Sequence, residues 1–323
     1  MHSTDIKIMS ISEKDILKAL ATVEEPDLKK DLVSLNMIKD IIIGPGKVEF
    51  TVILTTPACP LKELIKKNCT DAIHKLVDPG LNVEVKMVAE VTSTRGGTLL
   101  PQVKNIIAIS SGKGGVGKST VTSNLAVALA QSGAKVGLID ADISGPSIPT
   151  MFGIEDEQPL MTNIGGKNYI IPVEKFGIEI ISIGVLIPAD QAVIWRGPMV
   201  SSALRQFISD VYWSDLDYLL IDMPPGTGDV HLTLVQTVPV TGAVIVTTPQ
   251  KVSVADAQKG LMMFKQPQIN VPILGVIENM AYFTPAELPE NKYYIFGKGG
   301  GEALAAKNEV PFLGHLPLVQ SVR

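Results

Sequence analysis

The sequence predicts an α/β fold in which a parallel sheet carries helices on both faces and follows a small α+β domain. From about residue 103 onward, short apolar runs alternate with helical patterns, which is the order of a parallel sheet with crossover helices. Three of these runs lead into a glycine-rich turn or a carboxylate, as at the ligand-binding edge of such a sheet. Residues 1–91 instead combine two helical patterns with alternating strands. We therefore expect domains at 1–91 and 103–323, joined by the polar, glycine-containing linker 92–102.

The spacing of apolar residues predicts two helices and three strands in the first domain. Ser12 begins a helix with an apolar face, and a second helix spans about 60–77. Strands are expected within 32–43, at 47–54 and at 81–87, the last two because apolar residues alternate with mostly polar ones. Six residues are expected on the buried face of the second helix: Leu61, Leu64, Ile65, Ala72, Ile73 and Leu76.

The chain has two cysteines, too few for a disulfide framework. Cys69 lies four residues after Ile65 and four before Ile73, so we expect it in the core of the first domain. Cys59 directly precedes the expected helix start at Pro60. A helix N-terminus favours the thiolate, which is the form that attacks or binds metal. A structural loop cysteine is the alternative interpretation of Cys59.

A strand, a glycine-rich loop and a helix follow one another in the middle of the chain. The β-branched run at 106–109 predicts a buried strand, and residues 121–130 predict a helix with an apolar stripe. Between them, residues 112–119 (GKGGVGKS) fit the pattern G-x-x-x-x-G-K-[ST]. This order of strand, loop and helix is the one that builds a phosphate site.

The residue types in this loop suit the phosphates of a nucleotide. Glycines allow positive φ and leave room for a phosphate, so that backbone N–H groups converge on its oxygens at the helix N-terminus. Lys118 would neutralise the charge of the β- and γ-phosphates, and the Ser119 hydroxyl would be a ligand of Mg²⁺. The sequence therefore predicts a P-loop nucleotide site.

Two further strands of the second domain end in carboxylates. The apolar run at 135–140 ends at Asp140, at the edge where such sheets bind ligands. The run at 217–222 ends at Asp222, and such a strand-end Asp commonly presents a second group of the Mg²⁺ shell. A hairpin insertion is expected at about 158–187. The remaining elements are expected as strands at 242–248, 273–278 and 310–313 and as helices around 253–265 and 300–307.

Composition bounds the partners and the compartment. The 323 residues include 28 Lys+Arg and 33 Asp+Glu, which gives a formal net charge of −5 and no general attraction to nucleic acid or anionic membranes. The N-terminal residues lack the apolar region of a signal peptide, and no apolar run is long enough to span a bilayer. We therefore expect a cytoplasmic protein with no nucleic-acid and no membrane partner. The four histidines are scattered and predict no site.

Several motifs together resemble one family. The loop 112–119, with its second lysine at Lys113, resembles the deviant Walker A loop of the MinD/ParA/nitrogenase-iron-protein class of dimeric P-loop ATPases. Residues 140–147, 221–229 and 278–280 resemble more narrowly the Mrp/ApbC iron–sulfur cluster carriers. The first domain resembles the small iron–sulfur assembly domain fused to bacterial members, through the segments 24–27, 33–35 and 56–60.

The resemblance implies roles for residues at the matching positions. Lys113 would reach across a homodimer to the partner's phosphates, Lys118 would act on the phosphates in its own site, and Asp142 would orient the attacking water. Asp222 would hold Mg²⁺ together with Ser119. The nucleotide would be ATP, bound by Gly112, Lys113, Gly114, Gly115, Val116, Gly117, Lys118, Ser119 and Thr120, by Gly226 at the γ-phosphate and by Asn279 at the adenine.

The chain departs from the family pattern at two places. Family carriers place a C-x-x-C pair between the Glu-Asn-Met and Ile-Phe-Gly segments, but residues 281–294 contain no cysteine. A [4Fe–4S] cluster held by four thiolates across a dimer cannot form there. Either the cluster is held differently, for example through Cys59 of two subunits with other ligands, or cluster binding has been lost. The family also continues with a further helix after Pro317-Leu318, so we expect the family pattern to be cut short at the C-terminus.

The motifs lead to one function and two alternatives. The resemblance implies a slow, homodimeric Mg²⁺-dependent ATPase that transfers iron–sulfur clusters to apoproteins, with client proteins and assembly factors as partners. A MinD/ParA-like positioning or partitioning ATPase is the first alternative, disfavoured by the acidic composition. A nucleotide-gated scaffold without turnover, whose first domain recruits assembly partners, is the second.

Overall fold

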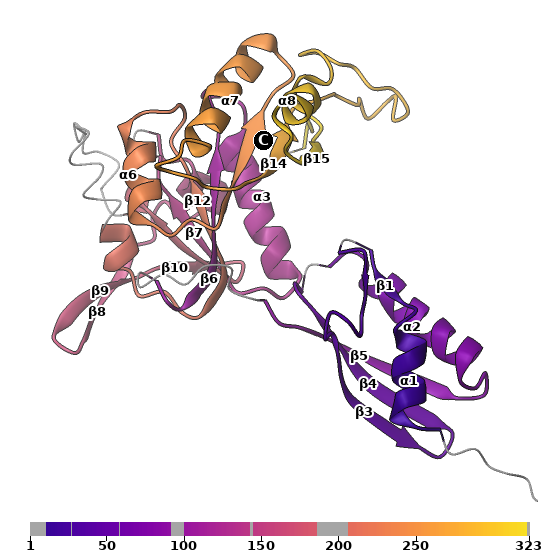
Figure 1. Ribbon diagram of the computed structural model, residues 1–323. Helices are drawn as coiled ribbons and strands as arrows, with labels where there is room; N and C mark the ends of the chain where they lie inside the picture. The colour runs from indigo at the N-terminus through magenta and orange to yellow at the C-terminus, as the bar shows by residue number, and fades with distance from the viewer. Residues whose placement is uncertain are drawn as a thin grey trace, which may run out of the picture. The chain divides into compact units, whose positions relative to one another are not determined.

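The computed structural model describes residues 11–26, 28–57, 59–91, 100–142, 145–185 and 206–321 (Figure 1). The chain divides into two compact units, residues 1–92 and 93–323. Of the linker expected at 92–102, residues 92–99 lie outside the described residues.

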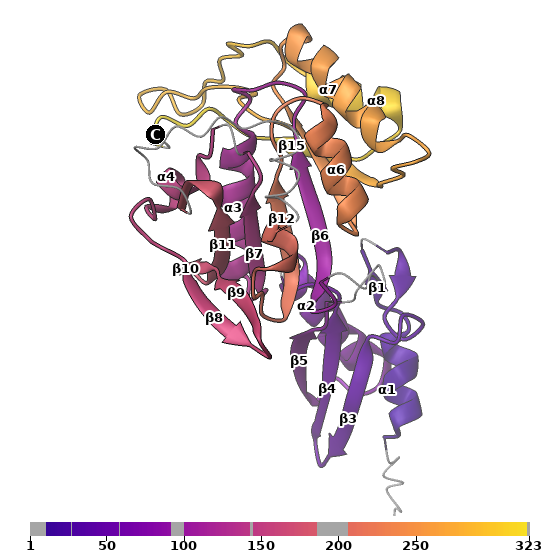
Figure 2. The same ribbon diagram turned by 90° about the vertical axis from the view of Figure 1, so that its left-hand side faces the viewer.

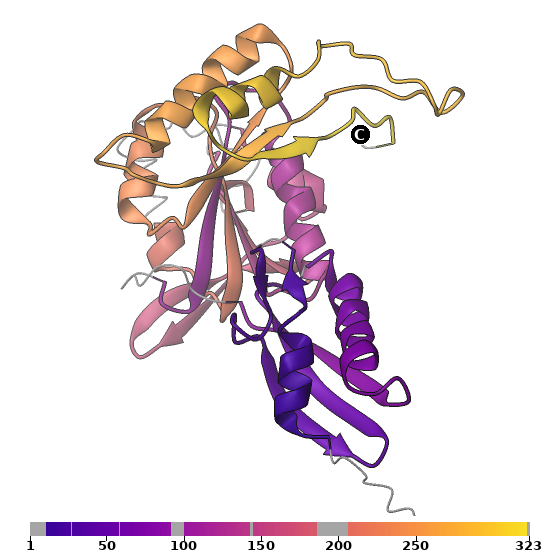
Figure 3. The same cartoon turned by 45° about the vertical axis from the view of Figure 1, so that its right-hand side comes forward.

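The first unit is a three-stranded sheet covered by two helices that contact each other (Figure 3). Strand β4 is central, antiparallel to β3 and parallel to β5, and its residues Val48, Phe50 and Val52 are fully buried in the core. The first helix begins with a capping box between Ser12 and Asp15. The elements are α1 (Glu13–Leu20), β1 (Glu24–Glu25), β2 (Lys30–Asp31), β3 (Ile38–Gly44), β4 (Lys47–Leu54), α2 (Lys62–Leu76) and β5 (Asn82–Ala89).

Helix α2 differs from the prediction in its start and its buried face. It begins at Lys62 rather than Pro60, and Leu64 and Leu76 are 46% and 54% exposed. The buried residues are Ile65, Cys69 and Ile73, a single row with a spacing of four, because α2 packs only through a narrow stripe. The prediction of a core thiol at Cys69 is confirmed, and burial raises the pKa of this thiol to about 12.

The second unit is built on an eight-stranded sheet in the order β10-β11-β7-β12-β6-β13-β14-β15, parallel except for the edge strand β10. Helices α3 and α4 lie on one side of this sheet, and α6, α7 and α8 lie on the other (Figure 2). The predicted fold class is thereby confirmed. The elements are β6 (Val103–Ser110), α3 (Lys118–Gln131), β7 (Val136–Asp140), α4 (Ile148–Phe152), β8 (Leu160–Ile164), β9 (Lys167–Ile171), β10 (Val173–Lys175), β11 (Ile178–Ser182), β12 (Leu216–Asp222), α6 (Asp229–Thr237), β13 (Gly242–Thr247), α7 (Lys251–Phe264), β14 (Ile273–Glu278), α8 (Gly300–Asn308) and β15 (Phe312–His315).

Only the first part of the segment expected as a hairpin insertion, at about 158–187, forms a separate hairpin. Strands β8 and β9 form a separate two-stranded hairpin that projects from the main sheet (Figure 1). Strand β11 instead pairs in parallel with β7 and joins the main sheet, because its apolar residues Ile178, Ile180 and Ile181 are buried in the core. Helix α6, which follows β12, was not predicted.

Candidate functional site

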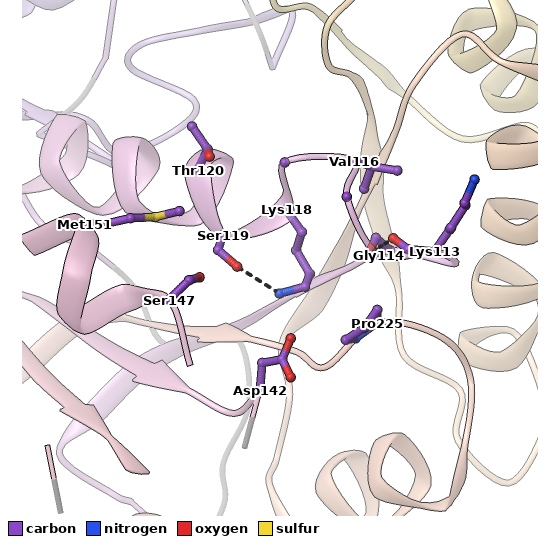
Figure 4. A pocket seen from close by; sticks show the side chains of 13 residues that line it. Lys113, Gly114, Val116, Lys118, Ser119, Thr120, Asp142, Ser147, Met151 and Pro225 are labelled. Atoms are coloured by element: carbon purple, nitrogen blue, oxygen red, sulfur yellow. Dashed lines mark hydrogen bonds between the residues drawn. The ribbon is translucent and has the colours of Figure 1, made fainter. Parts of the chain in front are cut away.

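The loop between β6 and α3 forms the floor of a pocket at the carboxyl end of the parallel strands (Figure 4). Strand β6 is central in the sheet, so the loop emerges where neighbouring strands also present their ends. The pocket is lined by the loop and by residues that follow β7 and β12: Ser111, Lys113, Gly114, Gly115, Val116, Gly117, Lys118, Ser119, Thr120, Asp142, Ser147, Met151 and Pro225.

Two glycines give the loop its shape, and a third lets it approach a helix. Gly115 and Gly117 have φ of 77° and 79°, which side chains rarely tolerate. Gly112 lies against the backbone of α7, where an added Cβ would be 2.0 Å from the carbonyl carbon of Asp256. The tight turn of the loop therefore depends on glycine for both conformation and space.

Gly112→Ala is expected to lower the free energy of unfolding by about 2–3 kcal/mol, because the neighbouring atoms are helix backbone and cannot rotate away. Gly114→Ala is the matched control, since its Cβ would meet nothing closer than Pro225 at 3.9 Å. Urea unfolding of both variants measures the difference. Equal stabilities would show that the close approach to α7 relaxes at little cost.

A buried group of polar side chains lies beneath the loop. The Nζ of Lys118 is 2.8 Å from Oδ1 of Asp222, and these two side chains are 6% and 0% exposed. The hydroxyl of Ser119 donates to Oδ2 of Asp222 at 2.6 Å, and that of Thr122 donates to Oδ1 at 2.8 Å. Asp222 thus holds the lysine and the serine of the loop in one hydrogen-bonded group beneath the floor of the pocket.

Asp142 lies on the pocket wall opposite the loop. Asp140, two residues earlier, accepts a hydrogen bond from its backbone N–H. Asp140 is fully buried and pairs in the strand register with Asp222. It accepts hydrogen bonds from the Asp142 N–H at 3.2 Å, the Ile148 N–H at 3.3 Å and the Ser182 hydroxyl at 3.0 Å. The sequence predicts for Asp140 only a place at the ligand-binding edge of the sheet, although its position two residues before Asp142 was a usable signal for a role in the site.

Burial raises the pKa of Asp140 from its ordinary value of 3.8 to about 7, and the charge of Asp222 contributes in the same direction. The folded protein therefore binds this proton more tightly than the unfolded chain does. The stabilisation is fully present below pH 4 and is lost as the pH rises through about 7. We expect Asp140→Asn to be more stable than wild type at pH 8 by an amount that shrinks toward pH 4.

Urea unfolding between pH 4 and pH 8 measures this difference, which is at most about 4 kcal/mol. Asp156→Asn, at an exposed carboxylate, is the control and should show no such trend. A stability difference between Asp140→Asn and wild type that does not change with pH would contradict the assignment of the titration to Asp140.

Gly226 and Asn279 contact the backbone of the loop rather than open space. The Gly226 N–H donates to the carbonyl of Ser111 at 2.9 Å, and Gly226 has a φ of 96°. The Asn279 side chain donates from Nδ2 to the carbonyl of Val116 at 2.8 Å and is 8% exposed. An added Cβ at Gly117 would meet this amide nitrogen at 2.3 Å. Asn279 therefore supports the loop in this structure, an arrangement that the sequence did not reveal.

Lys113 is not part of the buried group, and Cys59 belongs to the other unit. Lys113 is exposed, and its side chain points away from Lys118 (Figure 4). Cys59, in the first unit, is a half-buried free thiol that packs against the core of that unit. Because α2 begins at Lys62, Cys59 precedes the helix by three residues rather than one, which weakens the expected effect of the helix N-terminus.

Residues 281–294, where the family pattern has its cysteine pair, lie wholly within the described part of the chain. Residues 281–294 carry aromatic side chains, among them Tyr282, whose ring lies 4.4 Å from the Nζ of Lys292. In the described part of the chain, no three His, Cys, Asp or Glu side chains gather into a group that could hold a metal ion. None of the helices described here has the length and apolar character needed to cross a membrane.

A strand, a glycine loop and a helix that place a lysine and a serine beside a strand-end aspartate define a P-loop nucleotide-binding protein. Residues 102–323 match the family described as NUBPL iron-transfer P-loop NTPase, and residues 13–87 match the iron–sulfur cluster assembly protein family. The chain belongs to the NUBPL iron-transfer P-loop NTPase family. The predicted resemblance to the iron–sulfur cluster carriers is thereby confirmed.

Individual relatives agree with this assignment. The iron–sulfur cluster carrier protein of Synechocystis is 53% identical over 95% of this chain and 87% of its own length. That of Escherichia coli K12 is 43% identical over 94% of this chain and 81% of its own length. Among solved structures, a nucleotide-binding protein from Archaeoglobus fulgidus in complex with ADP is 40% identical, with a TM-score of 0.60 over 69% of this chain and 85% of that chain.

Proposed function

We propose that this chain is a homodimeric, Mg²⁺-dependent ATPase of low turnover that carries iron–sulfur clusters and transfers them to apoproteins. One observation carries the proposal. The buried group of Lys118, Ser119 and Asp222 has the chemistry of a phosphate and Mg²⁺ site. The two relatives named above as iron–sulfur cluster carriers match this chain over 87% and 81% of their own length.

The residues of the loop fit the phosphates and the metal. The Ser119 hydroxyl and the Asp222 carboxylate are hard oxygen ligands 2.6 Å apart, which is the ligand type that Mg²⁺ prefers. When bound, Mg²⁺ would neutralise charge on the β- and γ-phosphates. Lys118 would leave its ion pair with Asp222 for the phosphates, and the N–H groups of residues 112–120 would enclose their oxygens.

Hydrolysis requires groups on both sides of the γ-phosphate. Asp142, on the opposite pocket wall, would orient the attacking water, and its backbone is fixed by Asp140. Gly226 would meet the γ-phosphate, and Asn279 would bind the adenine edge. Lys113, exposed and directed away from Lys118 of its own subunit, would reach the phosphates of a second copy and so make catalysis depend on the dimer.

The cluster would be the cargo, and Cys59, which is half-buried, is the candidate for a ligand. Cys69 is fully buried with a raised pKa, and residues 281–294 supply no thiolate. A cluster held by Cys59 would need ligands from elsewhere, such as a second copy or the client protein.

Anaerobic reconstitution with iron and sulfide tests the carrier role. We expect wild type to hold iron and sulfide and to transfer them to an apo-acceptor, and Cys59→Ala to lose most of the bound iron. Cys69→Ala is the control, because its thiol is inaccessible. Wild type that binds ATP but holds no cluster and transfers none would end the carrier proposal while leaving the nucleotide site intact.

A further inference from the structure

His231 is a buried histidine that the sequence analysis set aside. It lies in the first turn of α6 and is 2% exposed. Helix α6 directly follows the loop 224–228, which leads away from Asp222 and carries Gly226. The imidazole is therefore enclosed beside a loop that faces the nucleotide pocket.

Two hydrogen bonds link His231 to the two ends of this loop. Its Nε2 lies 2.8 Å from the carbonyl of Pro224, and its backbone N–H donates to the carbonyl of Gly228 at 3.0 Å. Because a carbonyl only accepts, Nε2 must carry the proton. Burial lowers the pKa of His231, and the charge of Lys118 lowers it further, so the imidazole is neutral at pH 7. Its Nδ1 is then a bare acceptor, and it has no partner among the described residues.

The middle of the loop is held by a backbone hydrogen bond. The Gly226 N–H donates to the carbonyl of Ser111, so it cannot also meet a phosphate. Pro224 and Pro225 have no N–H and a fixed φ, which leaves Gly226, Thr227 and Gly228 as the residues of the loop whose φ can change. With both ends held by His231, a change of conformation confined to this short segment would release the Gly226 N–H from Ser111.

We propose that His231 is a positioning residue for ATP hydrolysis, which fixes the ends of the loop 224–228 so that Gly226 exchanges the Ser111 carbonyl for the γ-phosphate. This inference rests on the proposed ATPase function. His231 is not among the residues that line the nucleotide pocket, and it acts through the carbonyl of Pro224. Its loss should therefore slow the step that needs the γ-phosphate and leave the binding of ADP unchanged.

Three substitutions separate this role from simple packing. In His231→Gln, the side-chain Nε2 is the same number of bonds from Cα as in histidine and can still donate to Pro224. His231→Asn places its nitrogen at the position of Nδ1, too short to reach that carbonyl, and His231→Leu has no donor. Steady-state ATP hydrolysis gives kcat and KM, fluorescence titration with a labelled ADP gives its Kd, and thermal unfolding checks the fold.

We expect kcat to fall about tenfold in both His231→Leu and His231→Asn, with KM and the Kd for ADP within about threefold of wild type. His231→Gln should keep kcat within about threefold. Equal kcat values in all three variants, or a parallel loss of kcat and ADP binding, would overturn the positioning role. If His231→Leu does not fold, the comparison of Gln with Asn decides alone. Wild type without ATP turnover would instead refute the proposed ATPase function.

Discussion

Lys118→Ala is expected to lower the rate of ATP hydrolysis by about 10³-fold or more and to destabilise the folded protein as well. The first effect follows because Lys118 is the cation that would stabilise charge on the transferred phosphoryl group. The second follows because Asp222 is fully buried and would lose its only ion-pair partner in the described structure. An uncompensated buried carboxylate costs about 3–5 kcal/mol, and the hydroxyls of Ser119 and Thr122 place this site near the lower value.

The double variant Lys118→Ala/Asp222→Asn separates the two effects. Removing the charge of Asp222 should restore about half of the lost unfolding free energy while leaving hydrolysis abolished. Lys104→Ala, at a more exposed ion pair with Asp217, is the control and should change stability by less than about 1 kcal/mol. If the double variant were no more stable than Lys118→Ala, the ion pair would not be the source of the destabilisation.

Lys113→Ala is expected to lower ATP hydrolysis by about 10³-fold while leaving the fold and ADP affinity unchanged. The side chain is exposed at the edge of the pocket and points away from Lys118, so its removal leaves no buried group without a partner. A lysine supplied by a second subunit acts on the transition-state charge as an arginine finger does. Lys251→Ala, at an exposed lysine that begins α7, is the matched control and should retain full activity.

Mixing two inactive variants tests whether Lys113 acts across the dimer. In a dimer of Lys113→Ala with Lys118→Ala, one site contains an intact Lys118 together with the partner's intact lysine at position 113. Activity should therefore return to a substantial fraction of wild type when the two are mixed. Mixtures that remain inactive, although dimers form, would place Lys113 in its own subunit's site or outside catalysis.

Much of the fold could be predicted because its signals are local. The run of β-branched residues before Gly112 and the glycine–lysine–serine pattern after it define β6, the loop and the start of α3 within 15 residues. Strand β11 was missed because its place in the sheet depends on pairing with β7, about 40 residues away. The inward face of α2 was overestimated at Leu64 and Leu76, since periodicity gives an apolar stripe but not the width of the surface it meets.

The functional residues were missed for a different reason. Asp140 and His231 act through backbone groups: Asp140 accepts from the N–H of Asp142, and His231 reaches the carbonyl of Pro224. A sequence shows which side chains are present, but backbone partners become visible only when the turn that exposes them is known. Asn279 illustrates the same limit, because its hydrogen bond to Val116 joins segments more than 160 residues apart.

Because β6 lies between β12 and β13 in the sheet, it can pair only after both later strands have been synthesised. Its two neighbours, β12 and β13, begin at Leu216 and Gly242, more than 100 residues after β6 ends. At about 5–20 residues per second, the ribosome needs on the order of ten seconds to deliver the first of them. Until then both edges of β6 lack their partner strands, and unpaired strand edges can pair with other chains and promote aggregation.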